Sequence, residues 1–323
     1  MKKNVFFILI ALILLLASCG SLKEEGKTKE ANNKEIVTIQ NLDHELKITE
    51  PPKRAVSLNQ HVTEIMLALG LEDSMVGTAY LDDQILPEYE EAYKNIPVLS
   101  KKYPSYEVLI ASEPDFVYGG WKSAFTEKGV GTIEQLKKDG INAYLHESSN
   151  KVAPTMEDVF QDIYNIGKIF GVEDRAEKLT NKIEKEMNEI EAKIGEVKDP
   201  IPVFIYDSGE KEPFTAAQNF MNDLITRAGG ENIFGNIEKG WTSASWEEVV
   251  KRNPEVIVIM DYGEETVEQK KKFLENHPIL QAVKAVKEKR FVVLPLSAGS
   301  EGVRSTIALK TLAEGFYPEK FLE

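Results

Sequence analysis

The chain has 323 residues, ample for two domains with sizeable cores, and its 42% hydrophobic and 28% charged residues are ordinary for a globular protein. A formal net charge of −14 argues against a nucleic-acid-binding protein, which usually presents a basic face, although a local basic pocket would be compatible with it. The one cysteine excludes an intrachain disulfide.

The N-terminus has the pattern of an exported protein. Lys2 and Lys3 precede an apolar run at 5–16, which is too short to span a bilayer comfortably. The run leads into Leu-Ala-Ser-Cys-Gly, which resembles the bacterial lipobox. This resemblance implies cleavage before Cys19 and attachment of lipid to that cysteine. A plain signal peptide with a chance cysteine and a short membrane anchor are the alternatives.

The first 35 residues therefore divide into two expected segments. Residues 1–18 are predicted to be a lipoprotein signal peptide. Residues 19–35 are polar and charged, which favours a flexible tether between the membrane and the first folded residue. We expect the folded part to lie outside the cytoplasm, anchored to a membrane of the cell envelope through the lipid on Cys19.

Apolar runs and helical patterns alternate from residue 36 onward, which predicts an α/β fold. An antiparallel hairpin is expected at 35–48. Further predicted elements are strands at 54–58, 74–78, 115–118 and 142–146, helices at 63–70 and 127–139, and an acidic loop or irregular helix at 82–94.

One sequence template occurs twice, at 105–117 and 245–257. Each copy has a serine, any residue, a glutamate, a short apolar stretch and, nine residues after the serine, a proline followed by an acid and an apolar run. Ser105 and Ser245 are expected to cap short helices that the prolines end, and each apolar run suits a buried strand. The repeat suggests two similar lobes.

Between the two copies the pattern changes to long helices. Helices are predicted at 156–170 and 173–196, the second with dense Glu and Lys at i,i+4 spacing, which favours a rigid strut between domains. The α/β pattern then resumes, with strands expected at 203–206, 256–259 and 291–294 and helices at 220–228, 267–275 and 307–314. Mainly parallel sheets place ligands where the carboxyl ends of the strands meet the inter-lobe cleft.

Several stretches together resemble a known family, over roughly residues 36–323. These are the lipobox and polar tether, Pro-Pro-Lys-Arg-Ala-Val-Ser-Leu at 51–58, the helix from Thr63, the two templates and the ending from Arg304 through Tyr-Pro-Glu-Lys-Phe. They are similar to the helical-backbone (class III) substrate-binding proteins of ABC importers for ferric siderophores, haem and cobalamin.

The resemblance implies an N-terminal lobe at 36–170, an interlobe helix at 171–197 and a C-terminal lobe at 198–323. The ligand would lie in a cleft between the lobes, and the protein would be a monomer that works with a permease and its ATPase. An acid on each lobe would dock onto the permease. The matching positions are Glu107 and Glu247, whose other interpretation is simple complementation of a helix dipole.

Loops expected to face the cleft carry aromatic residues and a few donors, which suit a large flat or metal-chelate ligand. The candidate ligand contacts are His61, Tyr80, Trp121, Lys122, Tyr206, Trp241 and Arg304. Each aromatic could instead be half-buried between the lobes. His61 could ligate the metal of a chelate or haem, or serve only as a hydrogen-bonding group.

A ferric siderophore is the first ligand prediction, because Lys122 and Arg304 could neutralise an anionic chelate. Cobalamin, haem and anionic cofactor precursors are the alternatives. The four scattered histidines give no protein metal site, and no cofactor is expected. The rival class is a lipid-anchored enzyme or chelatase-like protein. The chain has no Gly-x-Ser-x-Gly elbow, P-loop or His-Glu-x-x-His, so a non-enzymatic binding protein is favoured.

Overall fold

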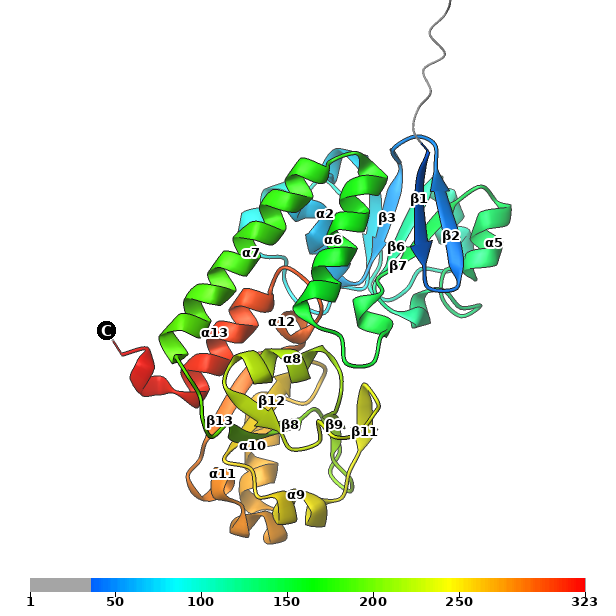
Figure 1. Ribbon diagram of the computed structural model, residues 1–323. Coiled ribbons are helices and arrows are strands. Elements are labelled where there is room, and N and C mark those ends of the chain that lie inside the picture. The colour runs from blue at the N-terminus through cyan, green and yellow to red at the C-terminus, as the bar shows by residue number, and fades with distance from the viewer. Residues whose placement is uncertain (1–35, 323) are drawn as a thin grey trace, which may run out of the picture. The chain divides into compact units, whose positions relative to one another are not determined.

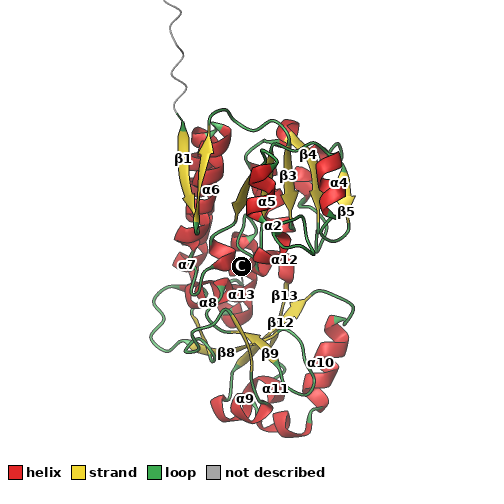
Figure 2. Cartoon of the chain, turned by 90° about the vertical axis from the view of Figure 1, so that its right-hand side faces the viewer, coloured by secondary structure: helices red, strands yellow, loops and turns green. Residues whose placement is uncertain are grey.

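Two parallel β-sheets, each flanked by helices, form the two lobes of the protein (Figure 1). The computed structural model describes residues 36–322, so Cys19 and the two expected N-terminal segments lie outside the described residues. Figure 2 shows β3 and β4 in one lobe and β8 and β12 in the other, with α12 and α13 between them. The predicted α/β class with mainly parallel sheets is confirmed.

The N-terminal lobe has a five-stranded parallel sheet in the order β5-β4-β3-β6-β7. Its strands are β3 (Ala55–Leu58), β4 (Met75–Ala79), β5 (Val98–Ser100), β6 (Phe116–Gly119) and β7 (Asn142–Leu145). Its helices are α2 (Gln60–Ala68), α3 (Glu90–Tyr93), α4 (Tyr106–Ala111) and α5 (Ile133–Lys138).

The predicted N-terminal hairpin is present as β1 (Val37–Asn41) and β2 (His44–Ile48). It protects the edge of the sheet through Asn41, whose amide accepts from the backbone N–H of Leu145 at 2.9 Å and donates to the carbonyl of Leu145 at 2.8 Å. A side-chain amide here substitutes for a neighbouring strand, so part of the edge that β7 would otherwise expose is satisfied.

The C-terminal lobe has a four-stranded parallel sheet in the order β10-β8-β12-β13, and a short antiparallel pair, β9 with β11. Its strands are β8 (Ile201–Tyr206), β9 (Phe214–Ala216), β10 (Gly230–Asn232), β11 (Trp241–Ser243), β12 (Val256–Asp261) and β13 (Phe291–Pro295). Its helices are α8 (Phe220–Arg227), α9 (Trp246–Arg252), α10 (Val267–Asn276), α11 (Lys284–Lys287), α12 (Leu296–Gly299) and α13 (Ser305–Phe316).

The chain passes from one lobe to the other through two long helices, α6 (Met156–Phe170) and α7 (Glu173–Ile194). Thr155 and Asp158 form a capping box at the start of α6, and Gly171 adopts φ +66° where the helix ends. Figure 1 shows α7 running along α6 and α13. The long charged helix expected from the sequence is therefore present, and it is packed on two neighbours.

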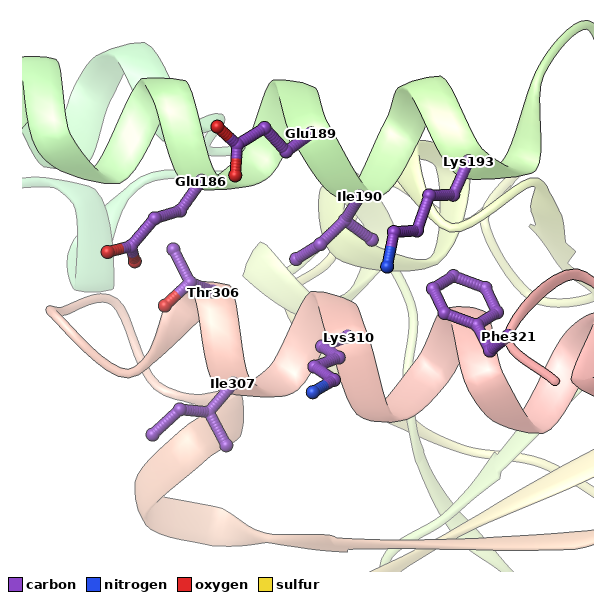
Figure 3. Close-up of a pocket in the computed structure, with 8 residues that line it drawn as sticks. All are labelled: Glu186, Glu189, Ile190, Lys193, Thr306, Ile307, Lys310 and Phe321. Atoms are coloured by element: carbon purple, nitrogen blue, oxygen red, sulfur yellow. The ribbon is translucent and has the colours of Figure 1, made fainter. Parts of the chain in front are cut away.

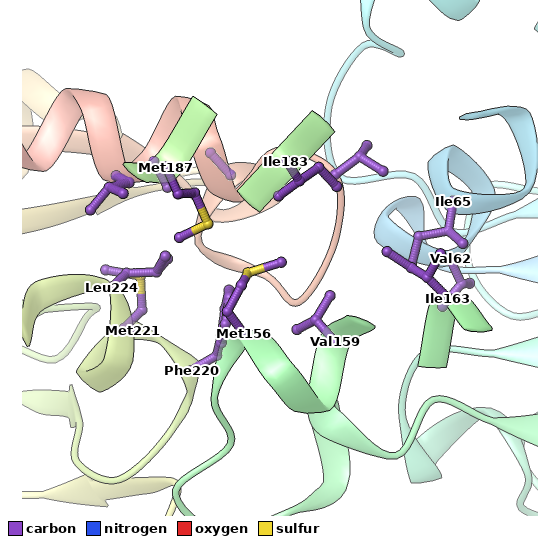
Figure 4. Close-up of a cluster of buried hydrophobic side chains, with 14 of the residues drawn as sticks. Val62, Ile65, Met156, Val159, Ile163, Ile183, Met187, Phe220, Met221 and Leu224 are labelled. Atoms are coloured by element: carbon purple, nitrogen blue, oxygen red, sulfur yellow. The ribbon is translucent and has the colours of Figure 1, made fainter. Parts of the chain in front are cut away.

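One hydrophobic core continues through both lobes. Figure 4 shows Met156 at the start of α6 beside Phe220 of α8, and Met187 of α7 near Leu224. Farther along α6, Ile163 packs toward α2 of the N-terminal lobe. Because close-packed interiors resist deformation, a core shared in this way opposes rigid-body separation of the lobes.

Both template copies form the expected cap–helix–strand unit. The hydroxyl of Ser105 accepts from the N–H of Val108 at 3.4 Å, and that of Ser245 accepts from the N–H of Glu248 at 3.2 Å. The strands that follow are β6 and β12, which lie at interior positions of their sheets.

Several local predictions were wrong. The helix predicted from Thr63 starts at Gln60, which puts His61 in its first turn and not in a loop. The helix predicted over 127–139 is confined to α5, since Gly129 and Gly131 occupy turns before it. The short strands β5, β9, β10 and β11 were not predicted, because three residues are too few for a periodic signal.

Candidate ligand-binding cleft

A cavity of about 210 Å³ lies between the two lobes. The N-terminal lobe contributes Trp121, Ser149 and Lys151 to its lining. The C-terminal side contributes Asn219, Met221, Gly240, Trp241, Met260, Leu296, Gly299, Ser300 and Glu301. Roughly 300–1,000 Å³ is needed to enclose a drug-sized ligand, so this cavity has room for part of a larger one.

The parallel strands explain why these residues meet. Trp121 follows β6, Ser149 follows β7, Met260 is near the end of β12 and Leu296 follows β13. The carboxyl ends of parallel strands point in one direction, and in each sheet this edge faces the other lobe. The site is therefore where the α/β topology predicts it.

Two tryptophans, one from each lobe, are the aromatic groups of the cavity. The Trp121 ring lies 5.0 Å from the His61 ring, centroid to centroid. Trp241 lies on β11 and stacks on Phe214 of β9, with the ring centroids 5.5 Å apart and the planes at 10°. These are the two predicted contacts that the structure brings together, and both are partly exposed.

His61 lies behind Trp121 and is only 3% exposed. Its Nε2 is 3.2 Å from the Ser149 hydroxyl. Burial, and next the nearby His146, hold the pKa of His61 well below its usual range, so the ring is neutral at pH 7. A methyl group on Gly120 would lie 2.4 Å from Cε1 of this ring, so only glycine allows the imidazole to pack there.

Glu301 is a functional candidate that the sequence interpretation missed. It lines the cavity, is 8% exposed, and its Oε2 accepts a hydrogen bond from the Ser149 hydroxyl at 2.9 Å. Burial raises the pKa of Glu301 to about 7, against the lowering effect of its own backbone and of Ser149. In a Ser-Glu-Gly loop, nothing in the sequence distinguishes a buried acid from a solvated one.

Behind Ser149 lies a buried polar group in the N-terminal lobe. The Tyr118 hydroxyl is 2.6 Å from Nδ1 of His146, and burial lowers the pKa of His146 to about 3. Asp162 accepts from the Tyr144 hydroxyl at 2.7 Å and from the Ser148 hydroxyl and N–H. These bonds fix the loop that carries Ser149.

Arg304 does not face the cavity as an open cation. Its Nε donates to Oε2 of Glu64 at 2.7 Å and its Nη2 donates to Oε1 at 2.6 Å. Its Nη1 donates to the Ser297 hydroxyl at 3.1 Å. Arg304 is 8% exposed and Glu64 is fully buried, so the guanidinium is already neutralised and hydrogen-bonded inside the protein.

The other predicted contacts are dispersed. Tyr206 is fully buried in the core of the C-terminal lobe, so it does not reach the cavity. Tyr80 has a left-handed backbone, φ +60°, and its ring packs against Tyr103 at 4.7 Å. Lys122 is exposed beside Trp121. Neither Tyr80 nor Lys122 lines the cavity.

Glu107 and Glu247 occupy equivalent positions in the two lobes. Each is exposed and lies in the first turn of its helix, α4 or α9. Within residues 36–322, neither carboxylate has a Lys, Arg or His partner within 4 Å, whereas the adjacent Glu248 is paired with Arg252 at 2.9 Å. The two acids are therefore open to an external cation.

Comparison with known proteins assigns the fold to a family. Residues 56–298 match the periplasmic binding protein family. The chain belongs to that family. A crystal structure of a periplasmic binding protein from Veillonella parvula is similar, with a TM-score of 0.82 and 34% identity over 88% of this chain and 98% of the other.

Two curated relatives extend the comparison. The uncharacterized ABC transporter substrate-binding lipoprotein YvrC of Bacillus subtilis (strain 168) is 28% identical over 332 residues, which cover all of both chains. A vitamin B12-binding protein of Vibrio parahaemolyticus is 27% identical over 209 residues, covering 64% of this chain and 70% of its own. The predicted membership of a substrate-binding protein family is confirmed.

A second, larger hollow lies away from the carboxyl ends of the strands. It is a groove of about 310 Å³ between α7 and α13, and its lining includes Ile190, Ile307 and Phe321 (Figure 3). Within residues 36–322, no three His, Cys, Asp or Glu side chains are grouped so as to hold a metal ion. Likewise, no helix in the described part of the chain is both long enough and apolar enough to cross a membrane.

Proposed function

We propose that this protein is the lipid-anchored substrate-binding component of an ABC importer, and that it holds its ligand in the inter-lobe cavity between Trp121 and Trp241. The observation that carries the proposal is the cavity itself, formed at the carboxyl edges of both sheets with one tryptophan from each lobe. Membership of the periplasmic binding protein family supports the transport role.

For the ligand we propose a corrinoid of the cobalamin type. The lining combines two indole rings with neutral hydrogen-bonding groups, Asn219, Ser149 and Ser300. Flat apolar surface and neutral amides, the two features of a corrin ring and its rim, match this lining. The vitamin B12-binding relatives support the same class.

The charges around the cavity favour this ligand over an anionic ferric siderophore. Arg304 is ion-paired with Glu64, and Nζ of Lys151 lies 2.7 Å from a carboxylate oxygen of Asp158. Glu301 adds a buried acid where an anionic chelate would need a cation. Lys122, the other cation expected to face an anionic chelate, is not part of the cavity lining. For haem, Nε2 of His61 is already engaged by Ser149.

We propose that Glu107 and Glu247 bind the permease when the ligand is delivered. Both are exposed without an intramolecular cation, and they repeat the same helix position in the two lobes. An arginine on each half of a permease would meet one acid from each lobe, which fixes the orientation of docking as well as its strength. The anchor is assigned to the lipid on Cys19, which keeps the protein outside the cytoplasm at the membrane that carries the permease.

The experiment is a titration of residues 20–323 with cyanocobalamin, haem, a ferric hydroxamate and a ferric catecholate, followed by tryptophan quenching. We expect submicromolar quenching by cyanocobalamin alone. Calorimetry should show at least tenfold weaker binding for Trp121→Ala and Trp241→Ala. Trp246→Phe is the matched control, since Trp246 is buried in the C-terminal core. Selective binding of a siderophore would reject the corrinoid, and silence with all four probes would reject the chelate class.

A further inference from the structure

The cavity lining includes a carboxyl group, that of Glu301, which has no cationic partner within the protein. Glu301 lines the cavity and is 8% exposed. Within residues 36–322 no Lys, Arg or His nitrogen lies within 4 Å of its carboxylate, and its one side-chain hydrogen bond is from Ser149. A buried carboxylate is normally matched by a cation or by several donors, whereas this one has no cation and only the Ser149 hydroxyl and its own backbone N–H as donors.

The groups that surround Glu301 do not supply the missing positive charge. His61 on α2 and His146 after β7 are both held neutral by burial. Asp162 on α6 adds a negative charge that disfavours ionisation of Glu301. Lys151 is paired with Asp158, and Arg304 is directed to Glu64. The electrostatic environment therefore favours the neutral carboxyl.

The hydrogen bonds around Glu301 are also compatible with a neutral carboxyl. A serine hydroxyl has one proton, so Ser149 can donate to Glu301 or to His61, but not to both at once. If Glu301 carries a proton on Oε1, Oε2 still accepts from Ser149, and the carboxyl proton stays available to a ligand. A protonated carboxyl thus satisfies the cluster at least as well as a carboxylate does.

We propose that Glu301 is a specificity-determining residue of the cleft: it presents a neutral carboxyl to the ligand, donates a hydrogen bond to an uncharged oxygen acceptor such as a corrin amide carbonyl, and takes up a proton when binding occurs above neutral pH. This inference rests on the proposed function, and it specifies the kind of ligand atom that Glu301 selects. A ligand that covers the cavity removes the remaining water from Glu301, which favours the uncharged form further.

The ligand affinity should therefore decrease as the pH rises, and it should not increase with pH in any range. Where Glu301 is already protonated in the free protein, affinity does not change with pH. Above that range, a proton must be taken from solution, so the dissociation constant rises by up to tenfold for each pH unit. If Glu301 instead acted as a carboxylate toward a cationic ligand group, affinity would increase with pH.

The test measures cyanocobalamin affinity by calorimetry from pH 5.5 to 8.5 in wild type and Glu301→Gln. We expect the wild-type dissociation constant to be flat well below pH 7 and to rise about 30-fold by pH 8.5. A glutamine side chain is permanently neutral and can donate, so Glu301→Gln should bind equally at all pH values. The exposed Glu264→Gln should follow wild type. A flat wild-type profile, or affinity that increases with pH, overturns the inference and leaves the proposed function intact.

A second measurement does not depend on a ligand. Trp121 and Trp241 line the same cavity as Glu301, so the fluorescence of the unliganded protein should titrate with a midpoint near pH 7. Glu301→Gln should abolish that transition, and the histidines should not produce it because their pKa values are lowered. Absence of the transition in wild type, or its persistence in Glu301→Gln, refutes a neutral Glu301. If none of the four probes binds but this transition is present, the chelate class is rejected and the neutral state of Glu301 stands.

Discussion

Arg304 and Glu64 form a buried ion pair with two hydrogen bonds, of 2.7 and 2.6 Å, that joins segments 240 residues apart. Glu64 comes from α2 of the N-terminal lobe, and Arg304 precedes α13. Asp83 adds a second contact in the same place, since its Oδ2 accepts from the Ser297 hydroxyl at 3.1 Å. The pair therefore fastens the C-terminal part of the chain to the N-terminal lobe beside the cleft.

Removing one partner of this pair should strongly destabilise the protein. In Glu64→Gln the guanidinium of Arg304 stays buried without a counter-charge, which typically costs about 3–5 kcal/mol of unfolding free energy. Denaturant unfolding at pH 7 measures the loss. Glu45→Gln is the matched control, because Glu45 and Lys47 form an exposed pair, and it should change stability by less than about 0.5 kcal/mol. A loss below about 1 kcal/mol for Glu64→Gln would show that the pair does not fasten the lobes.

Glu301 should make the protein less stable as the pH rises. Its pKa is about 7 in the folded protein against 4.5 for an ordinary glutamate, so between these values the folded state binds more protons than the unfolded state. Stability attributable to Glu301 therefore falls from pH 4.5 to about pH 7 and then levels off. Each pKa unit corresponds to 1.36 kcal/mol, so the total is about 3 kcal/mol.

Glu301→Gln should remove this pH-dependent loss of stability, because glutamine does not ionise. We expect it to match wild type near pH 4.5 and to be more stable at pH 8 by up to about 3 kcal/mol, as measured by urea unfolding at both pH values. The exposed Glu264→Gln should leave the pH profile unchanged. Equal destabilisation by Glu301→Gln at the two pH values would indicate a purely packing role for this side chain.

The packing of His61 against Gly120 should be needed for ligand binding. A methyl group on residue 120 would lie 2.4 Å from Cε1 and 2.5 Å from Nε2 of His61, so Gly120→Ala must displace the ring that supports Trp121. We expect a stability loss of about 1–3 kcal/mol and at least tenfold weaker binding of the ligand. Gly240→Ala is the matched control, since it also lines the cavity and its methyl would meet nothing closer than 3.9 Å. Similar behaviour of the two variants would contradict this role.

The sequence predicted the architecture better than the site, for a physical reason. Helix caps and strand runs are local, so Ser105, Ser245 and the helix at 156–170 could be assigned from spacing alone. Trp121 and Trp241 were correctly placed near the cleft because they adjoin strand ends or template copies. Arg304 was predicted to be an open cation, since its partner Glu64 is 240 residues away and no periodicity reveals such a pair.

Docking onto the permease should depend on Glu107 and Glu247 without involving the cavity. Both acids are exposed in the first turns of α4 and α9, so Glu107→Lys and Glu247→Lys should fold normally. A lysine would face the proposed arginine of the permease, and like charges at an interface cost several kcal/mol. We expect each reversal to reduce ligand-stimulated ATPase activity of the reconstituted importer at least tenfold, and the double variant to abolish it. The ligand dissociation constant should stay within twofold of wild type. Glu184→Lys on the exposed side of α7 provides the control, and it should support full activity. Normal stimulation by the double variant would mean that these acids only complement their helix dipoles.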